Sequence, residues 1–340
     1  MRTKRGSLCF AAMVIACLAV ATTLNAASPD VGFYKGKVLN YIVATKPGGG
    51  YDAYARLIGK YMQKYLPGST VVIKNIPGAG HIIGANETYL AKPDGLTIGT
   101  FNTGLIYSQI IGQSGIRFDL TKYSWVGKGN SELRVLLMGI KTPFMTVKDV
   151  LDFKGEIRMP SSGVGSQDYN ETMILAVALP ANFKAMPGYA GREGEMAIMR
   201  GEVSGTIGSY TGLIGFIKAK ECRVLLQFGG HKHKDLPDVP HASELTLSPK
   251  GKSLVNLINN IAQVGRLTAA PPGVSPARLE ALREAYGKAV RDPDLLKEAA
   301  KVSLDIDAAV GEDVAKLVRD AVNQPPDNLA LLKSIIKVEQ

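Results

Sequence analysis

Glycine-rich turns that follow strand-like apolar runs constrain the fold of this 340-residue sequence more than any other feature. Two of them, Gly48-Gly49-Gly50 and Gly78-Ala79-Gly80, lie between runs rich in β-branched residues and segments with helical spacing of apolar residues. The predicted strands are 38–45, 70–76 and 96–102, and the predicted helices are 53–66 and 82–93. This alternation predicts an α/β fold with parallel strands and right-handed crossovers.

The middle of the chain repeats the alternation, and the end is rich in helices. A third turn, Gly163-Val164-Gly165-Ser166, separates a strand-like run from a helix-like one. Further strands are expected at 134–140, 203–210 and 222–230, and further helices at 146–153, 193–202, 275–292, 292–303, 311–322 and 329–339. The length is sufficient for two domains.

The first residues have the pattern of a secretory signal peptide. Basic residues at Arg2, Lys4 and Arg5 precede an uncharged apolar run, Leu8–Leu24, and small residues follow it. The pattern predicts a signal peptide at 1–26, cleaved after Ala26, and therefore export. A membrane anchor and lipidation of Cys17 are the alternatives. The run is short for a span and continues past Cys17, which favours cleavage.

Charge and cysteine content exclude several classes of protein. The formal charge of +10 becomes +7 without the signal peptide, and the lysines and arginines are scattered, which argues against nucleic-acid binding. Cys222 is then the only cysteine, so no internal disulfide is expected. His231 and His233 lie in the lysine-rich loop "GGHKHKDLPDVP", with His241 eight residues later, and the loop histidines are expected to be solvated rather than zinc ligands.

Five ordered blocks of sequence resemble one family. They are "IVATKPGGGYDAYAR", "VVIKNIPGAGHIIGANETYLAKPDGLTIGT", "MPSSGVGSQDYNETMI", "MPGYAGREGEMAIMRGEVSGTIGS" and "CRVLLQFGGHKHKDLPDVPHASEL". Together they resemble the solute receptors of tripartite tricarboxylate transporters, often called Bug receptors. The similarity runs from about Tyr34 to the C-terminus.

The resemblance implies a two-lobed periplasmic binding protein of the type II-like kind, each lobe a mostly parallel sheet flanked by helices. Lobe 1 would comprise 30–130 and 255–340, and lobe 2 would comprise 131–254. Such a receptor would bind a small organic anion, usually a carboxylate, without catalysis or a cofactor. It would act as a monomer in the periplasm and deliver the solute to integral-membrane permease subunits.

Three departures from the family pattern lie close to the expected pocket and leave the ligand open. Ala44-Thr45-Lys46 stands where the family has Pro-Phe before the first loop. His81 replaces a glycine, and Ser204 replaces an aspartate. Lys46 either pairs with a ligand carboxylate or is solvated.

The turns themselves suit an anion, because glycine exposes backbone N–H groups and the following helix adds its unpaired N–H groups and positive dipole end. The candidate ligand-binding residues are Gly49, Gly50, Tyr51, Asp52, Gly78, Ala79, Gly80, His81, Thr103, Ser162, Gly165, Ser166, Tyr189, Ser204 and Tyr210. Asp52 is the weakest of these, because it is better suited to cap the first helix. Tyr51, Tyr189 and Tyr210 either line the pocket or pack against neighbouring side chains in the core or at its rim. His81 either donates a hydrogen bond to the ligand or is solvated.

Two kinds of exported enzyme are the alternatives. A dinucleotide enzyme would use Gly78-x-Gly80-x-x-x-Gly84, but this spacing is a weak signal and Asp94 lies too near to bind the ribose. An ester-processing enzyme would use a Gly-x-Ser-x-Gly nucleophile elbow, and this sequence does not contain one. The sequence therefore favours a receptor.

Overall fold

Six strands from the two ends of the chain form the larger sheet of the computed structural model, which describes residues 28–189 and 192–336. The strands are β1 (Val38–Val43), β2 (Thr70–Asn75), β3 (Thr97–Thr100), β4 (Ser124–Lys128), β10 (Leu267–Ala270) and β11 (Ala309–Val310), in the order β11-β4-β10-β3-β1-β2. β1 pairs parallel with β2 and β3, as the sequence predicts, whereas β10 and β11 pair antiparallel. The predicted signal peptide and Cys17 lie outside the described residues.

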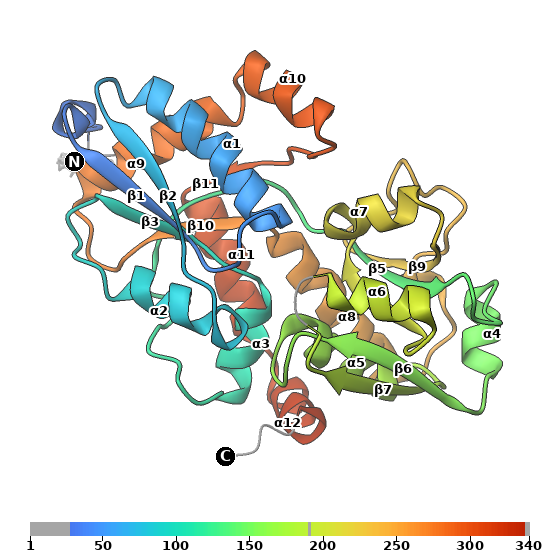
Figure 1. Ribbon diagram of the computed structural model, residues 1–340. Helices are drawn as coiled ribbons and strands as arrows, with labels where there is room; N and C mark the ends of the chain where they lie inside the picture. The colour runs from blue at the N-terminus through green and yellow to red at the C-terminus, as the bar shows by residue number, and fades with distance from the viewer. Residues whose placement is uncertain (1–27, 190–191, 337–340) are drawn as a thin grey trace, which may run out of the picture.

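Helices cover both faces of this sheet (Figure 1). They are α1 (Gly50–Tyr65), α2 (Ile82–Tyr89), α3 (Gly104–Ile111), α9 (Pro276–Ala289), α10 (Pro293–Lys301), α11 (Glu312–Val322) and α12 (Pro326–Ile335), with short 3₁₀ turns η1 (Val31–Tyr34) and η2 (Ala79–His81). Trp125 and Val126, adjacent on β4, point into different cores because successive side chains of a strand alternate between faces.

A second group of strands, β5 to β9, forms the other half of the molecule. β5 (Arg134–Gly139) pairs antiparallel with β8 (Gly205–Ser209) and β9 (Cys222–Phe228), and β6 (Glu156–Ser161) pairs parallel with β7 (Asn182–Pro187). Its helices are α4 (Val147–Asp152), α5 (Gln167–Ala178), α6 (Glu193–Arg200) and α7 (Tyr210–Lys218), with η3 (Ala242–Glu244). Helix α8 (Pro249–Val264) packs against both α5 and α11 and so leads from this half to the other. The Ser204 N–H donates to the Arg158 carbonyl at 2.7 Å, and this bond joins the three-stranded sheet of β5, β8 and β9 to the pair β6 and β7.

The protein is a two-lobed α/β structure, and Figure 1 shows the two halves side by side. We refer to the half with the six-stranded sheet as lobe 1 and to the other as lobe 2. We propose the predicted limits for them, 30–130 with 255–340 and 131–254. The segments that form each sheet support this division, because the larger sheet takes its strands from 38–128 and 267–310 and the smaller sheets from 134–228.

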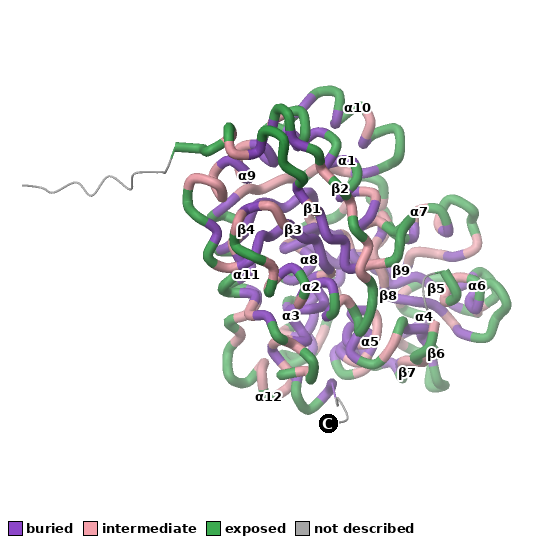
Figure 2. The backbone as a smooth tube through the Cα atoms, turned by 60° about the vertical axis from the view of Figure 1, so that its left-hand side comes forward, coloured by how far each residue is buried: buried purple, intermediate pink, exposed green. Residues whose placement is uncertain are grey.

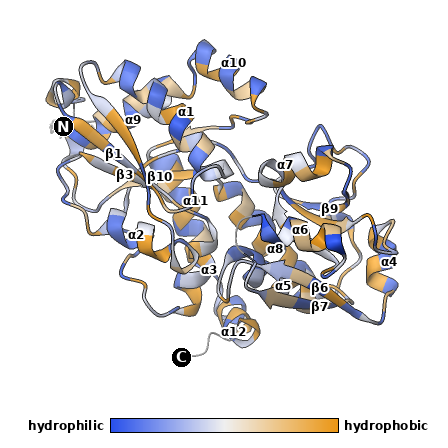
Figure 3. Ribbon diagram, in the orientation of Figure 1, coloured by the Kyte–Doolittle hydropathy of each residue, from blue (hydrophilic) through white to orange (hydrophobic). Residues whose placement is uncertain are grey.

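One hydrophobic core runs through both lobes. Trp125 of lobe 1, Leu136 and Ile174 of lobe 2, and Ile258 of α8 belong to the same buried cluster. Figure 2 shows the buried stretches along the strands of both lobes, and Figure 3 shows hydrophobic strands beside helices, such as α6 and α10, that carry both kinds of residue. The central strands are therefore the interior of each lobe, whereas β2 and β7 lie at the edges of their sheets, and the helices form an amphipathic cover.

Several elements lack the pattern that predicts the others. No local pattern predicts α3, α7, α8, β4, β7, β10 or β11, and the helical pattern of α1 begins at residue 53 rather than at Gly50. The antiparallel strands β10 and β11 come from the far end of the chain and complete a sheet begun by β1 to β4. Pairing of such distant segments has no local signal, so the sequence indicated more parallel pairing than the structure has.

Candidate ligand-binding site

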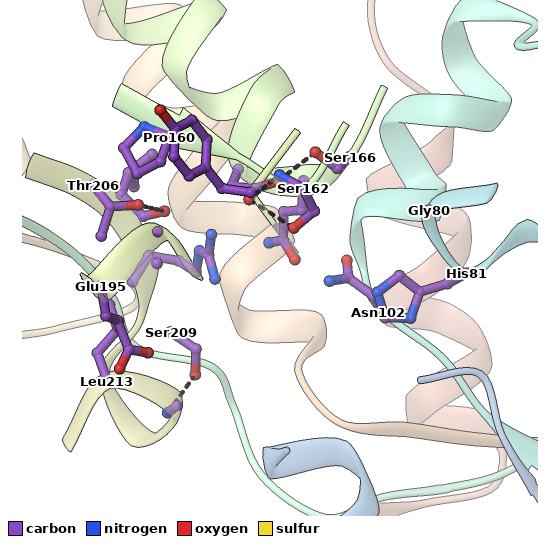
Figure 4. Close-up of a pocket in the computed structure, with 18 residues that line it drawn as sticks. Gly80, His81, Asn102, Pro160, Ser162, Ser166, Glu195, Thr206, Ser209 and Leu213 are labelled. Atoms are coloured by element: carbon purple, nitrogen blue, oxygen red, sulfur yellow. Dashed lines mark hydrogen bonds between the residues drawn. The ribbon is translucent and has the colours of Figure 1, made fainter. Parts of the chain in front are cut away.

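A cavity of about 270 Å³ lies between the two lobes (Figure 4). Gly80, His81 and Asn102 contribute its wall on the side of lobe 1. The wall on the side of lobe 2 comprises Arg134, Pro160, Ser162, Ser166, Gln167, Asp168, Tyr189, Gly194, Glu195, Thr206, Ile207, Gly208, Ser209, Gly212 and Leu213. A solute in this cavity would therefore contact both lobes at once.

Four helices begin at the cavity. His81 is the N-cap of α2, and Gln167 is the first residue of α5. Glu195 lies in the first turn of α6, and Gly212 lies in the first turn of α7. The N-terminal end of a helix carries unpaired N–H groups and a partial positive charge, so the backbone alone makes this cavity attractive to an anion.

Arg134 is the one arginine in the cavity wall among the described residues, and it is almost fully buried. It is paired in register with Ser209, at the carboxyl end of β8. Its guanidinium forms an ion pair with Glu171 through two nitrogens, of which Nε lies 2.9 Å from Oε2, and Nη1 lies 3.4 Å from Glu132. Its positive charge is therefore already matched inside the protein.

Arg266 extends this buried network to lobe 1. Its Nη2 donates to Ser209 Oγ at 2.9 Å and lies 3.6 Å from Glu132 Oε1. Its guanidinium stands 4.0 Å above the ring of Tyr51, whose hydroxyl donates to Glu132 at 3.3 Å. Burial acts to raise the pKa of Glu132, but Arg266 and Arg134 together bring that pKa below its ordinary value. Glu132 is thus held ionised between Arg134, which belongs to lobe 2, and Arg266, which belongs to lobe 1.

Sequence reasoning missed this network and Asn102. Arg134 begins the apolar strand β5 and Arg266 directly precedes the apolar strand β10, and a charge in such a position is the only local hint that they are buried. Asn102 follows β3, and its Oδ1 accepts a hydrogen bond from the Gly104 N–H, which leaves its Nδ2 available to the cavity.

The cavity wall contains five of the predicted residues: Gly80, His81, Ser162, Ser166 and Tyr189. His81 adopts a left-handed backbone (φ 82°), and its Nδ1 is buried without a partner. Burial lowers the pKa of His81 to about 4, so its imidazole is neutral near pH 7. The hydroxyls of Ser162 and Ser166 both donate to Asp168, the former at 2.9 Å, so they already have an acceptor.

Other predicted residues support the site from outside the cavity. Asp52 is buried and accepts hydrogen bonds from the Gly48 N–H and the Asn75 amide, both at 2.9 Å, so it holds the turn that leads into α1. Gly50 lies against the guanidinium of Arg266, and Tyr51 lies beneath it. A side chain at position 50 would meet that guanidinium at 3.0 Å, so glycine allows the arginine its place.

The remaining predicted residues have other surroundings. Ser204 Oγ accepts a hydrogen bond from the Arg158 N–H. Gly49, Gly78, Ala79, Thr103 and Gly165 lie in the loops that lead to the cavity but are not part of its wall. Lys46 is exposed, which supports the solvated alternative.

Tyr210 lines a second cavity of about 500 Å³ at the segments that join the lobes. His233 lies there, with Nε2 3.5 Å from Asp305, whereas His241 is buried and its Nε2 lies 3.2 Å from the Gly229 carbonyl. His241 follows the lysine-rich loop and is covered where it bridges in parallel with Gln227, whereas His231 within the loop is exposed. In residues 28–189 and 192–336, no group of three His, Cys, Asp or Glu side chains is placed to hold a metal, and no helix is long and apolar enough to cross a membrane.

Comparison with known proteins agrees with this architecture. Residues 54–332 match the model of the tripartite tricarboxylate transporter family receptor. The chain belongs to this family. A protein encoded in the tcbD-tcbE intergenic region of Pseudomonas sp. strain P51 is 26% identical over 309 residues, which cover 84% of this chain and 90% of that protein. The receptor identification from five sequence blocks is thereby confirmed.

Solved structures share the fold. The periplasmic binding protein BugD has a TM-score of 0.73 at 20% identity, over 89% of this chain and 98% of BugD. MatC from Rhodopseudomonas palustris, solved with bound malate, has a TM-score of 0.70 at 20% identity, over 88% of this chain and 99% of MatC. The family is one of solute-binding receptors, so this chain is a binding protein and not an enzyme.

Proposed function

We propose that this receptor captures a small organic carboxylate in the cavity between its lobes. The convergence of four helix N-termini on one cavity carries the proposal, because together they attract an anion without any unpaired cationic side chain. The cavity size supports a small solute, since pockets for drug-sized ligands typically hold about 300–1,000 Å³. The bound malate of MatC, a protein of the same fold, is an acid of this class.

The arrangement also supports a transport role in the periplasm. Because the cavity takes wall residues from both lobes, a bound solute favours the arrangement in which the lobes are close together. A permease can then distinguish the loaded receptor from the empty one. We propose that the partner is the membrane permease of a tripartite tricarboxylate-type transporter, and that the protein reaches the periplasm through its N-terminal signal.

The test is calorimetric titration of the purified protein with a panel of organic acids, for the wild type and for Asn102→Asp. This change keeps the shape and the oxygen that caps Gly104, but it places a negative charge in the cavity wall. We expect affinity for the preferred acid to fall at least about tenfold, because like charges at close range repel. Asn182→Asp, an equal change at the exposed start of β7, is the control.

The control variant should bind like the wild type. Equal affinity of Asn102→Asp and the wild type would place the solute elsewhere. Failure of every acid in a broad panel to bind, with a nicotinamide dinucleotide or an uncharged solute binding instead, would overturn the proposed function.

A further inference from the structure

The charged groups of the cavity wall differ in whether they have partners. Arg134 is paired with Glu171 and Glu132. Asp168 accepts hydrogen bonds from the N–H and the hydroxyl of Ser162, at 2.8 and 2.9 Å, and from the Ser166 hydroxyl. These pairings use the protein's own groups, so neither residue requires anything from a solute.

Glu195 is the exception. It lies in the first turn of α6, partly buried, and lines the cavity. Within the described part of the chain no donor reaches its carboxylate at hydrogen-bonding distance, and no cation lies close enough for an ion pair. Arg192 acts on it only through space, and burial raises the pKa of Glu195 despite that arginine. The carboxylate of Glu195 thus faces the cavity without a donor.

A second acceptor in the wall is also unpartnered. Gln167 is 5% exposed, and its Nε2 donates to Glu171 Oε1 at 2.9 Å. This bond fixes the orientation of the amide, so the other atom, Oε1, is an acceptor, and it has no partner. The cavity wall therefore has two acceptors without a donor, the buried Gln167 Oε1 and the partly buried carboxylate of Glu195, and a plain carboxylate offers no donor to Glu195.

Donor groups for an anion lie on both sides of the cavity, whereas Glu195 lies on one side only. Figure 4 places His81 and Asn102 on one side of the cavity and Glu195, Ser209 and Leu213 on the other. Asn102 offers an amide donor, and Ser209 stands at the start of α7, so anion-binding groups occur on both sides. A plain acid would bring its negative charge into a cavity that also contains the free carboxylate of Glu195.

We propose that the solute is a small carboxylic acid that also carries a hydrogen-bond donor, a hydroxyl or an ammonium group, and that Glu195 accepts from that donor and selects for it. The inference rests on the proposed function and specifies its ligand class. The helix N-termini bind the carboxylate, and Glu195 binds the donor. Glu195 then distinguishes a substituted acid from a plain one of equal length.

The test compares matched acids by calorimetric titration. Each set has one carbon skeleton in plain, hydroxyl and amino form: propionate, lactate and alanine; succinate, malate and aspartate; glutarate, 2-hydroxyglutarate and glutamate. In at least one set we expect the wild type to bind a substituted acid about tenfold or more tightly than the plain acid, as a charge-assisted hydrogen bond allows.

Three variants identify the residue responsible for that preference. Glu195→Leu should abolish it and tighten binding of the plain acid, because the acceptor and the repelling charge are both gone. Glu195→Gln keeps an acceptor without charge, so it should retain most of a preference for hydroxyl but lose most of one for ammonium. Glu202→Gln is the control, since Glu202 is exposed, pairs with Arg200 and lies outside the cavity wall.

Two results would count against the inference in different ways. If plain acids bind as tightly as their substituted forms, or if Glu195→Leu keeps the wild-type preference, Glu195 does not select the solute, while the proposed function stands. If no acid binds to the wild type in these sets or in a broader carboxylate library, the proposed function itself fails. Circular dichroism of each variant confirms that a lost preference does not reflect a lost fold.

Discussion

His81 shows how much one residue of the cavity depends on burial. Its ring packs edge-on against Tyr51, with centroids 5.9 Å apart, and its Nδ1 has no partner. Burial is the largest influence on its pKa, opposed by the nearby charges of Asp168 and Glu132 and assisted by Arg266. The outcome is a neutral imidazole, which can donate or accept a single hydrogen bond without adding charge to the cavity.

The lowered pKa predicts a pH-dependent stability. Unfolded His81 takes up a proton near pH 6.5, while the folded form resists protonation down to about 4. Between these two pH values the unfolded state therefore binds more protons than the folded state. The contribution of His81 to the free energy of unfolding is complete above pH 6.5 and is lost as the pH falls toward 4. We expect the free energy of unfolding, measured with urea, to fall less between pH 7 and pH 5 for His81→Asn than for the wild type. The difference should be on the order of 1 kcal/mol.

Asparagine suits this test because it tolerates the left-handed backbone at position 81. His231→Asn, on an exposed loop, controls for the loss of a histidine and should follow the wild type. A pH profile of His81→Asn that coincides with that of the wild type would mean that position 81 is solvated.

At the scale of elements, the packing of α2 on β1 sets the position of the Gly80–His81 turn. Gly84 sits where the helix crosses the end of the strand, and a Cβ there would lie 2.7 Å from both the Ala44 Cβ and the Ile76 carbonyl oxygen. The third glycine of Gly78-x-Gly80-x-x-x-Gly84 thus permits close contact of helix and strand, while the second permits a left-handed turn (φ 59°).

We expect Gly84→Ala to destabilise the protein by about 1–3 kcal/mol, because backbone atoms must move apart to admit the methyl group. The start of α2 should shift with them, so affinity for the preferred acid should also fall. Gly215→Ala is the matched control, since this helical glycine of α7 has open space around it and the change should stabilise by up to about 1 kcal/mol. Chemical denaturation and titration measure both effects; equal behaviour of the two variants would show that α2 does not pack closely.

At the scale of the whole molecule, the lobes share a core and a buried charge network. The largest hydrophobic cluster contains Trp125 of lobe 1 and Leu136 of lobe 2, and Arg266 bonds to Ser209 across the lobes. Removal of one lobe would expose apolar surface and leave Glu132 with a single arginine, which is costly for a buried charge. The two lobes therefore stabilise one another.

This coupling predicts a single unfolding transition. Differential scanning calorimetry of the ligand-free protein should give one peak, with a calorimetric enthalpy close to the van't Hoff enthalpy. Two resolved peaks would show that the lobes unfold independently and that the shared core contributes little. A titrated acid should raise the temperature of the whole peak, because it binds only the folded state.

Much of the fold follows from local pattern. Runs of β-branched residues, glycine-rich turns and helical periodicity predict β1 to β3, α1 and α2, because each depends on neighbours within a few positions. The same turns predict an anion site and bring Gly80 and His81 to the cavity. Short elements without such a pattern, such as β10 and β11, are decided by the sheet that they complete.

The amino-acid pattern alone is sufficient for the alternation of β1 to β3 with α1 and α2, for the glycine-rich turns and for the family to which the chain belongs. Only the tertiary structure decided which groups meet in the cavity. It brings Arg266 to Glu132 and Arg134 to Glu171, turns the hydroxyls of Ser162 and Ser166 toward Asp168, and leaves Glu195 without a donor. The physical reason is that periodicity reports on a residue's near neighbours, whereas the charge balance of a buried site depends on side chains brought together by packing from distant parts of the chain.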